Sequence, residues 1–213
     1  FKKILILSGG ISEERDISQS SANHVYETIK NEAIIKILDV SDNADQLLMN
    51  IKKFSPDVIF NCLHGYFGED GQIQSILNYL KIPYTHSGVL TSAILMNKVI
   101  SKKLFKSLGI RSPEFLSEYN INNKELKFPL IIKPVNGGSS YGLIKVNNKE
   151  SLIKYLNKKK IKKCEMLIEE FIFGRELTVG ILENKICGVM EIKFSEELYD
   201  YNNKYINIAE HII

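Results

Sequence analysis

The residues best suited to chemistry lie in one short loop, His64–Gln72, which reads HGYFGEDGQ. It holds a histidine, a glutamate and an aspartate, which supply proton transfer or charge, and three glycines, which let the backbone approach a ligand closely. The loop follows an apolar run at Val58–Phe60 and precedes an amphipathic segment at Ile73–Leu80. Open α/β sheets bind ligands where parallel strands end, so the loop is a candidate site. An ordinary strand-to-helix turn with a capping acid explains the same residues equally well.

A second group of polar residues lies further along the chain. Lys98 and Lys133 flank the loop Asn136–Gly142, which reads NGGSSYG and whose backbone N–H groups could cradle phosphate. Lys133 stands between a buried strand and a proline, where a charge is costly unless it meets an anion. Glu169 lies in a mixed apolar and acidic run that suits a purine edge, and Glu176 could accept hydrogen bonds from ribose. Taken singly, each feature is better explained as surface charge near a strand end.

The elements that must position the first loop alternate in type over residues 1 to about 95. Short apolar runs predict buried strands, and the amphipathic runs between them predict helices. This order predicts a doubly wound parallel sheet of the α/β class. The first turn contains Gly9 and Gly10 but no GxGxxG, which argues against a nicotinamide cofactor. The predicted strands are Lys3–Leu7, Ile34–Leu38, Asp57–Cys62 and Ile82–Tyr84, and the predicted helices are Ser18–Lys30, Ala44–Phe54 and Gln72–Leu80.

The pattern changes near residue 95, so we predict a second, α+β domain over residues 96–213. One or two helices are expected over residues 88–108. The glycine loop has strands on both sides and no GKS or GKT sequence, so it is not a Walker P-loop. The other predicted elements are strands at Pro129–Pro134, Leu143–Val146 and Met166–Glu169, a helix at Ser151–Leu156, and an antiparallel pair formed by Glu176–Leu182 and Ile186–Glu191.

Composition narrows the class of protein. The chain has 213 residues, 44% of them apolar and 25% charged, which suits one or two globular domains with a real core. The net charge of +3 is too balanced to favour a nucleic-acid partner, and no segment approaches membrane-spanning length. Cys62, Cys164 and Cys187 form no CxxC pair, so we expect buried free thiols in a reducing compartment, the cytoplasm.

Taken together and in order, the motifs resemble the D-alanine–D-alanine ligase family of ATP-grasp enzymes. The resemblance covers nearly the whole chain, and changes such as Thr85-His86 fall at positions that it leaves variable. The matching runs are Gly9–Ser18, His64–Gly71 with Gln74, Pro83-Tyr84 with Ser87-Gly88, Asn97-Lys98, Ile132–Pro134 with Gly138–Ser140 and Gly142, Ile168-Glu169 with Gly174 and Glu176, and Tyr199–Tyr201 with Lys204-Tyr205.

The resemblance implies a fold and a reaction. The fold is an N-terminal Rossmann-like, pre-ATP-grasp domain over 1–95, followed by an incomplete α+β ATP-grasp domain over 96–213. In the reaction, ATP phosphorylates the carboxylate of one D-alanine, and the amine of a second D-alanine displaces the phosphate to give a dipeptide for peptidoglycan. The implied cofactors are ATP and Mg²⁺ (or Mn²⁺). The implied partners are D-alanine and a second copy of the chain, bound through the N-terminal domain.

The resemblance also assigns substrate-binding and catalytic residues. It implies that Glu14 holds the ammonium of the first substrate, a charge-assisted contact, with Ser18 beside it. It places Ser139 and Tyr205 in a hydrogen-bonded network with Glu14, and His64 near the second substrate. The tyrosine at 205 points to a dipeptide product rather than a depsipeptide. The residues implied to bind the nucleotide are Lys98, Lys133, Gly138, Ser140, Glu169, Glu176 and Lys204.

The family continues into a further part that carries an Arg–Asp pair and a Glu-x-Asn run followed by Pro-Gly. None of these residues is in this sequence, so no metal ligand is assigned, and we expect the 213 residues alone to lack turnover. We also expect exposed apolar surface on the second domain, where that part would pack. Two alternatives stay open at this point. One is a catalytically incomplete remnant of such a ligase, and the other is a different ATP-grasp carboxylate–amine ligase.

Overall fold

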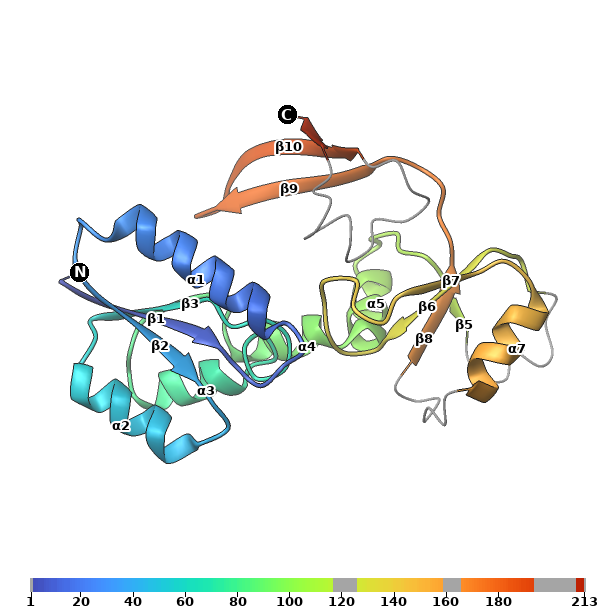
Figure 1. Ribbon diagram of the computed structural model, residues 1–213. Coiled ribbons are helices and arrows are strands. Elements are labelled where there is room, and N and C mark those ends of the chain that lie inside the picture. Colours follow the sequence, from blue (N-terminus) through green and yellow to red (C-terminus); the bar gives the residue numbers. More distant parts are fainter. Residues whose placement is uncertain (1, 117–125, 159–165, 194–209, 213) are drawn as a thin grey trace. The chain divides into compact units, whose positions relative to one another are not determined.

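The computed structural model describes residues 2–116, 126–158, 166–193 and 210–212 (Figure 1). The chain forms two compact units. The first comprises Phe1–Leu108 with Asn136–Gly138, and the second comprises Gly109–Val135 with Ser139–Ile213. These compact units are not evidence for the boundaries of domains. The domain boundary predicted near residue 95 therefore stays a prediction.

The first unit contains the parallel sheet that the sequence predicts. Its four strands lie in the order β2-β1-β3-β4, and every neighbouring pair is parallel. The expected α/β class is therefore confirmed. The elements are β1 (Lys3–Gly9), α1 (Arg15–Ile29), β2 (Ile34–Val40), α2 (Ala44–Phe54), β3 (Val58–Asn61), α3 (Gln72–Tyr79) and β4 (Tyr84–Thr85).

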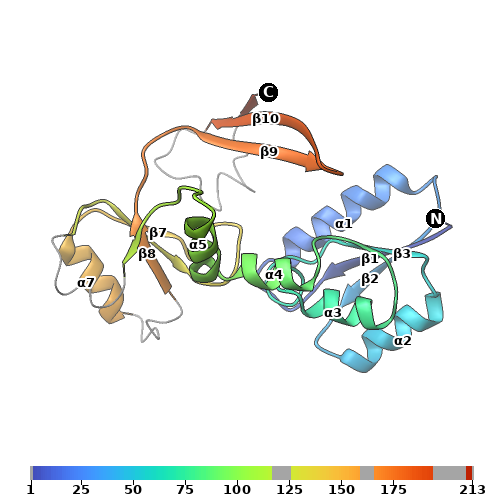
Figure 2. The ribbon, with the colours of Figure 1, turned by 180° about the vertical axis from the view of Figure 1, so that it is seen from behind.

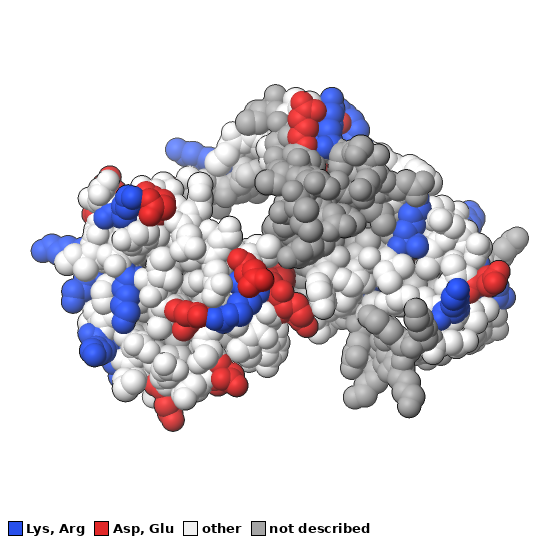
Figure 3. All heavy atoms as spheres, in the orientation of Figure 1, with Lys and Arg blue, Asp and Glu red and all other residues white. Residues whose placement is uncertain are grey.

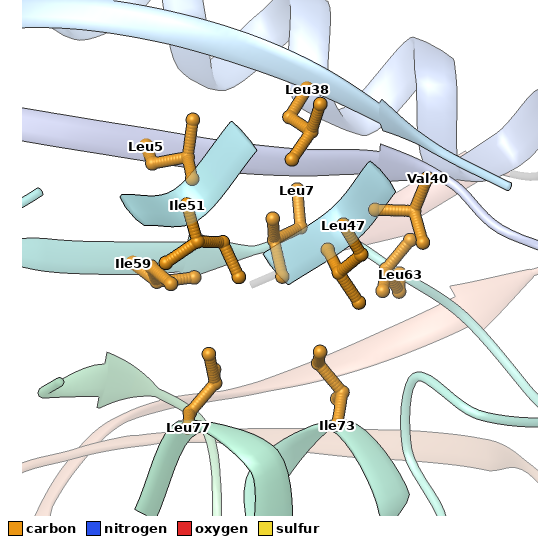
Figure 4. Close-up of a cluster of buried hydrophobic side chains, with 10 residues drawn as sticks. All are labelled: Leu5, Leu7, Leu38, Val40, Leu47, Ile51, Ile59, Leu63, Ile73 and Leu77. Atoms are coloured by element: carbon orange, nitrogen blue, oxygen red, sulfur yellow. The ribbon is translucent and has the colours of Figure 1, made fainter. Parts of the chain in front are cut away.

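Successive side chains of β1 pack on opposite faces of this sheet, as strand geometry requires. Leu5 and Leu7 join a core with residues of α2 and α3, whereas Ile6 packs with Ala22 of α1. Figures 1 and 2 show α1 on one side of the sheet and α2 and α3 on the other. Figure 4 shows the buried members of the larger core, which are Leu5, Leu7, Leu38, Val40, Leu47, Ile51, Ile59, Leu63, Ile73 and Leu77.

The strand order places a topological switch point beside β1. The chain leaves β1 for β2 on one side and later enters β3 on the other side. The loops that follow β1 and β3 therefore lead to helices on opposite faces of the sheet, which is the point at which open α/β sheets bind ligands. Those loops carry Glu14 and His64, two of the three residues that the sequence assigns to the substrate.

Two helices complete the first unit, and one asparagine separates them. These helices are α4 (Val89–Met96) and α5 (Lys98–Ser107). Asn97 has extended backbone angles, so α4 ends there. Its side-chain oxygen accepts the N–H groups of Val99 and Ile100, which caps the first turn of α5.

The described residues of the second unit form two antiparallel sheets. The first has the strand order β5-β8-β6-β7, and α7 supplies Leu152 to its core beside Leu130, Ile132, Val146 and Ile168. The second sheet has the order β11-β10-β9. The elements are β5 (Phe115–Leu116), β6 (Leu130–Pro134), β7 (Ile144–Val146), α7 (Lys149–Lys158), β8 (Met166–Glu170), β9 (Glu176–Leu182), β10 (Lys185–Lys193) and β11 (Glu210–Ile212).

The β9–β10 hairpin turns where the sequence predicts. Glu183 and Asn184 both have positive φ, 48° and 65°, which is the backbone of a tight two-residue hairpin turn. Every residue of β9 is exposed, so apolar side chains of the hairpin face solvent. The most exposed of them are Ile181, Leu182 and Ile186.

Surface and thiol exposure complete the description. Lysines, arginines and acids intermingle on the face of the first unit seen in Figure 3, as a balanced net charge suggests. Among the described residues, every helix is too short or too polar to cross a membrane.

Cys62 is buried as expected, and burial raises the pKa of its thiol to about 11. The expectation is wrong for Cys187, which lies on the open hairpin and is exposed, and Cys164 lies outside the described residues.

Candidate functional site

The candidate site of the first unit is built around Glu14. This residue immediately precedes α1, and only 5% of its surface is exposed. Its backbone N–H donates to Ser12 Oγ (3.2 Å) and its carbonyl accepts the N–H of Ser18 (3.0 Å). Among the described residues, however, no group donates to the Glu14 carboxylate or forms an ion pair with it. A buried carboxylate is costly without such a partner, so this one is suited to binding a cation.

Two side chains, those of Arg15 and Ser12, hold the loop before Glu14 against the rest of the sheet. The Arg15 guanidinium forms an ion pair with Asp39 and donates to the carbonyl of Gly10 (2.9 Å). Ser12 Oγ donates to the carbonyl of His64 (2.7 Å). The loops after β1 and β3 are thereby tied together, and they bring Glu14 beside the His64 loop.

Glycine lets the His64 loop approach the Glu14 carboxylate. Gly65 has a φ of +66°, and a Cβ at this position would lie 2.7 Å from Glu14 Oε2. A Cβ on Gly138 would lie 3.6 Å from Glu14 Oε1, so a second glycine also comes close to this carboxylate. The loop of His64 and Gly138 thus both lie close to Glu14, although the sequence assigns Glu14 and His64 to the substrate and Gly138 to the nucleotide.

The His64 imidazole lies between two polar side chains. Its Nδ1 is 4.0 Å from Glu69 Oε1, and its Nε2 is 3.4 Å from Ser21 Oγ. Glu69 also accepts the N–H of Gly65 (2.7 Å), which fixes the carboxylate within the loop. A histidine held between a carboxylate and a hydroxyl is suited to passing a proton or to orienting a polar ligand.

Ser18 is completely buried near the start of α1, and the described residues offer its hydroxyl no hydrogen-bond partner. The sequence assigned Ser18 to substrate binding through the resemblance alone. Ser18 lies one turn after Glu14 and is buried. Its assignment to the substrate stays a prediction.

Lys98 lies at the first position of α5 and beside a hollow of about 320 Å³. Its Nζ donates to the carbonyl of Gly137 (2.6 Å), and the Gly137 N–H donates to Met96 Sδ (3.2 Å). These contacts hold the first glycines of the NGGSSYG loop against the helix that carries the lysine. The hollow is lined by Glu69, His86, Ser87, Lys98, Gly137 and Gly138, among others.

In the second unit, Lys133 and Glu169 form an ion pair across the neighbouring strands β6 and β8. The Glu169 side chain is 6% exposed and that of Lys133 is 23% exposed. The anion that Lys133 needs at a buried strand end is therefore supplied by Glu169. Two residues that the sequence assigns to nucleotide binding thus lie side by side.

The remaining assigned residues of the second unit lie at strand ends and in the glycine loop. Ser139 and Ser140 have φ of 49° and 57°, a backbone that non-glycine residues adopt only at some cost. Glu176 is exposed at the first position of β9. Tyr205 and Lys204 lie outside the described residues, so their assigned roles stay predictions, as do those of the other site residues.

Residues that sequence reasoning left out also contribute to the site. Ser12 and Ser21 contact His64, and Asn61, at the end of β3, organises the loop through its side-chain amide. A serine two residues before an acid is a known signal of a side-chain-to-backbone turn, so Ser12 could have been noticed. Nothing in the sequence marks Ser21 or Asn61, because their contacts depend on the packing of α1 and on β3.

The part of the chain that the structure describes holds no ready site for Mg²⁺. Within the described ranges, no three histidine, cysteine, aspartate or glutamate side chains are grouped so that they could hold a metal ion. The residues present in those ranges therefore do not fit a metal site on their own.

Comparison with known proteins agrees with the fold of the chain. A family described as D-ala D-ala ligase C-terminus matches residues 104–213, and one described as D-ala D-ala ligase N-terminus matches residues 38–87. Both halves of the chain thus match the same class of enzyme, so the chain belongs to the D-alanine–D-alanine ligase family.

Individual relatives extend the match over the whole chain. A D-alanine–D-alanine ligase of Pelagibacter ubique is 47% identical over 98% of this chain and 70% of its own length. A crystal structure of the Bacillus anthracis ligase is 32% identical and has a TM-score of 0.78, covering 100% of this chain and 72% of that one. A second structure of the B. anthracis ligase, complexed with ATP, is 29% identical with a TM-score of 0.75, and the match covers 100% of this chain and 71% of that one.

Proposed function

We propose that this chain binds ATP and D-alanine and takes part in the ligation of two D-alanines to D-alanyl-D-alanine. The observation that carries the proposal is the Glu14 carboxylate, which is 5% exposed and has no cationic or hydrogen-bonding partner among the described residues. The ammonium group of an amino acid supplies such a partner. Relatives named as D-alanine–D-alanine ligases, one of them complexed with ATP, support this substrate and this nucleotide.

The chemistry runs in two steps. The carboxylate of the first D-alanine attacks the terminal phosphorus of ATP, which gives an acyl phosphate and ADP. The amine of the second D-alanine then attacks the acyl carbon, phosphate leaves with the bonding electrons, and the amine loses a proton. Positioning and charge compensation account for most of the acceleration in reactions of this kind.

Each assigned residue has a role in this proposal. Glu14 holds the first ammonium, and Ser18, Ser139 and Tyr205 are assigned to the same substrate network. In this proposal His64, whose imidazole lies between Glu69 and Ser21, orients the second D-alanine and accepts the proton of its amine.

The nucleotide is bound by a second set of residues. Lysines compensate the charge of the phosphates, the glycine–serine loop supplies backbone N–H groups, and acids contact adenine and ribose. The residues assigned to these roles are Lys98, Lys133, Gly138, Ser140, Glu169, Glu176 and Lys204. The proposal includes Mg²⁺ (or Mn²⁺) as the ion that accompanies ATP, but no step is assigned to it because the described residues do not supply a ligand set.

The biological setting follows from the product. D-alanyl-D-alanine is a building block of peptidoglycan, so the proposed activity serves cell-wall synthesis and cell shape. We place it in the cytoplasm, where ATP is made, and propose a homodimer through the first unit.

The test is ADP release by the purified chain with ATP, Mg²⁺ and D-alanine, with the product identified by mass, and with D-alanine binding measured alongside. Glu14→Gln keeps the shape of the side chain but removes the charge that holds the ammonium, so it should abolish D-alanine binding. Glu32→Gln, at an exposed glutamate, is the matched control and should change nothing. Loss of D-alanine binding only in Glu14→Gln supports the proposal.

Equal D-alanine binding by wild type and Glu14→Gln contradicts it. A folded chain that binds both substrates without turnover favours the alternative function, a catalytically incomplete relative of the ligases. A dipeptide other than D-alanyl-D-alanine favours another carboxylate–amine ligase.

A further inference from the structure

His86 is a histidine in an unusual backbone position beside the hollow of Lys98. It follows β4 directly and has a φ of 157°. Positive φ is costly for a residue with a side chain, and it persists where surrounding contacts hold the residue in place. The ring lines the same hollow as Lys98, Gly137 and Gly138.

Asn61 is the first residue that holds His86 in place. It is 3% exposed, and the N–H of Leu63 donates to its Oδ1 (3.1 Å) while its Nδ2 donates to the carbonyl of Gly68 (3.0 Å). These two backbone contacts determine which end of the amide is oxygen and which is nitrogen. The same Nδ2 lies 3.0 Å from His86 Nδ1, so a donor faces that ring nitrogen.

Gln74 presents a second amide to the same ring nitrogen. It is fully buried in α3, and its Nε2 donates to the carbonyl of Gly68 (2.8 Å), which fixes its orientation as well. Its Nε2 is 3.5 Å from His86 Nδ1. Because amide nitrogens only donate, Nδ1 of His86 must accept, and the neutral ring must carry its proton on Nε2.

The electrostatic surroundings favour this neutral form. Burial lowers the pKa of His86 below its ordinary value of 6.5, the Glu69 carboxylate opposes this effect, and His64 adds to it. A second proton would also have to sit on Nδ1, directly against the two amide donors.

The hollow presents donors to whatever enters it. His86 Nε2 and Ser87 Oγ have no hydrogen-bond partner among the described residues, and the Lys98 ammonium lies on the same wall. The acid of the hollow, Glu69, is already engaged by the Gly65 N–H and lies near His64. This combination favours an anionic oxygen, such as that of a phosphate.

We propose that His86 is a neutral hydrogen-bond donor to a phosphate oxygen of the nucleotide bound beside Lys98, and that Asn61 and Gln74 select Nε2 as its donating atom. The proposal rests on the proposed use of ATP by this chain. It adds a nucleotide-binding residue and a pair of buried amides that position it.

The first experiment is nitrogen NMR of the imidazole in the ligand-free chain. It should show His86 neutral near pH 7, with the proton on Nε2, and the Nε2–H resonance should shift when the non-hydrolysable ATP analogue AMP-PNP is added. A proton on Nδ1 in the ligand-free chain overturns the proposal. So does an Nε2–H resonance that stays unchanged at saturating analogue, because a purely structural histidine would behave in that way.

The second experiment compares AMP-PNP affinity, by calorimetry, in wild type and three variants. His86→Gly relieves the positive φ while it removes the donor, so it should fold normally and bind about 10- to 100-fold more weakly, as loss of a hydrogen bond to a charged group implies. His86→Gln returns a donor at the position of Nε2 and should recover most of the affinity. His24→Gln, at an exposed histidine of α1, should equal wild type.

Equal affinity in wild type and His86→Gly overturns the role of His86 and leaves the proposed function standing. A wild-type chain that does not bind AMP-PNP contradicts the proposed function itself, and the role of His86 fails with it. The two failures are therefore distinguishable.

Discussion

Replacement of Gly65 by alanine should damage the site in two separable ways. The first cost is conformational, because Gly65 has a φ of +66° and an L residue pays about 1–2 kcal/mol in that region. The second is steric, because the new Cβ would lie 2.7 Å from Glu14 Oε2, closer than such atoms come in real structures. The carboxylate must therefore move away from the His64 loop.

Gly109 offers a control that carries only the first cost. It follows α5, its φ is +71°, and a Cβ there meets nothing within 4 Å. Gly109→Ala should therefore lower the free energy of unfolding by about 1–2 kcal/mol, which corresponds to about 2–8 °C in Tm for a chain of this size. It should leave ligand binding unchanged.

The assay is thermal unfolding by circular dichroism together with calorimetric D-alanine binding for both variants. Gly65→Ala should lose at least as much stability as Gly109→Ala and, in addition, bind D-alanine about 10-fold more weakly, because the displaced Glu14 carboxylate meets the ammonium in poorer geometry. If the two variants match in both readouts, the Glu14 carboxylate is not held beside Gly65, and the account of the site is wrong.

Three further predictions concern burial and charge. Iodoacetamide should label Cys187 and spare Cys62 in the folded chain, as read by peptide mass spectrometry, because Cys62 is buried with its thiol pKa raised to about 11; equal labelling of the two contradicts this. Folding lowers the pKa of His86, so as the pH falls through about 6.5 the unfolded chain binds a proton more readily than the folded chain. The free energy of unfolding, measured by urea titrations between about pH 7.5 and 5.5, should therefore fall as the pH falls. The fall should be less steep in His86→Gln. Lys133→Met should lower the free energy of unfolding by about 3–5 kcal/mol, because it leaves Glu169 buried without its cation. In urea titrations the double variant with Glu169→Gln should regain much of that loss, and an undiminished loss would refute the pairing.

Strong periodicity made most of the fold predictable. α2 has the predicted bounds, and β1, β2 and β9 differ from prediction at most by two residues at their ends. The sequence did not predict short elements that form only by pairing with another strand. β5, only two residues long, exists because Phe115 and Leu116 pair with β8, and no local pattern announces that pairing.

The start of α1 shows a related difficulty. The helix begins at Arg15, three residues before the predicted start at Ser18. Glu14 precedes it without a side-chain capping bond, so the usual sequence signal for a helix start is missing there. The buried acid that forms the candidate site is thus placed where a capping residue would otherwise stand.

The site was predictable in outline but not in its hydrogen bonds. The order of motifs pointed to Glu14 and His64 through the resemblance, and strand order explains why their loops meet. The environment of His86 was not predictable, because it depends on how Thr85 pairs with Phe60 and on the orientation of the Asn61 amide. Register and amide orientation arise from tertiary packing, which a single sequence does not display.

The hydrogen bond from Ser12 Oγ to the carbonyl of His64 has a consequence for motion. It joins two loops that are 52 residues apart in the chain. Local opening occurs in cooperative groups of contacts, so the backbone amides of these two loops should exchange with solvent together rather than independently. A ligand that contacts either loop would then slow exchange in both loops together.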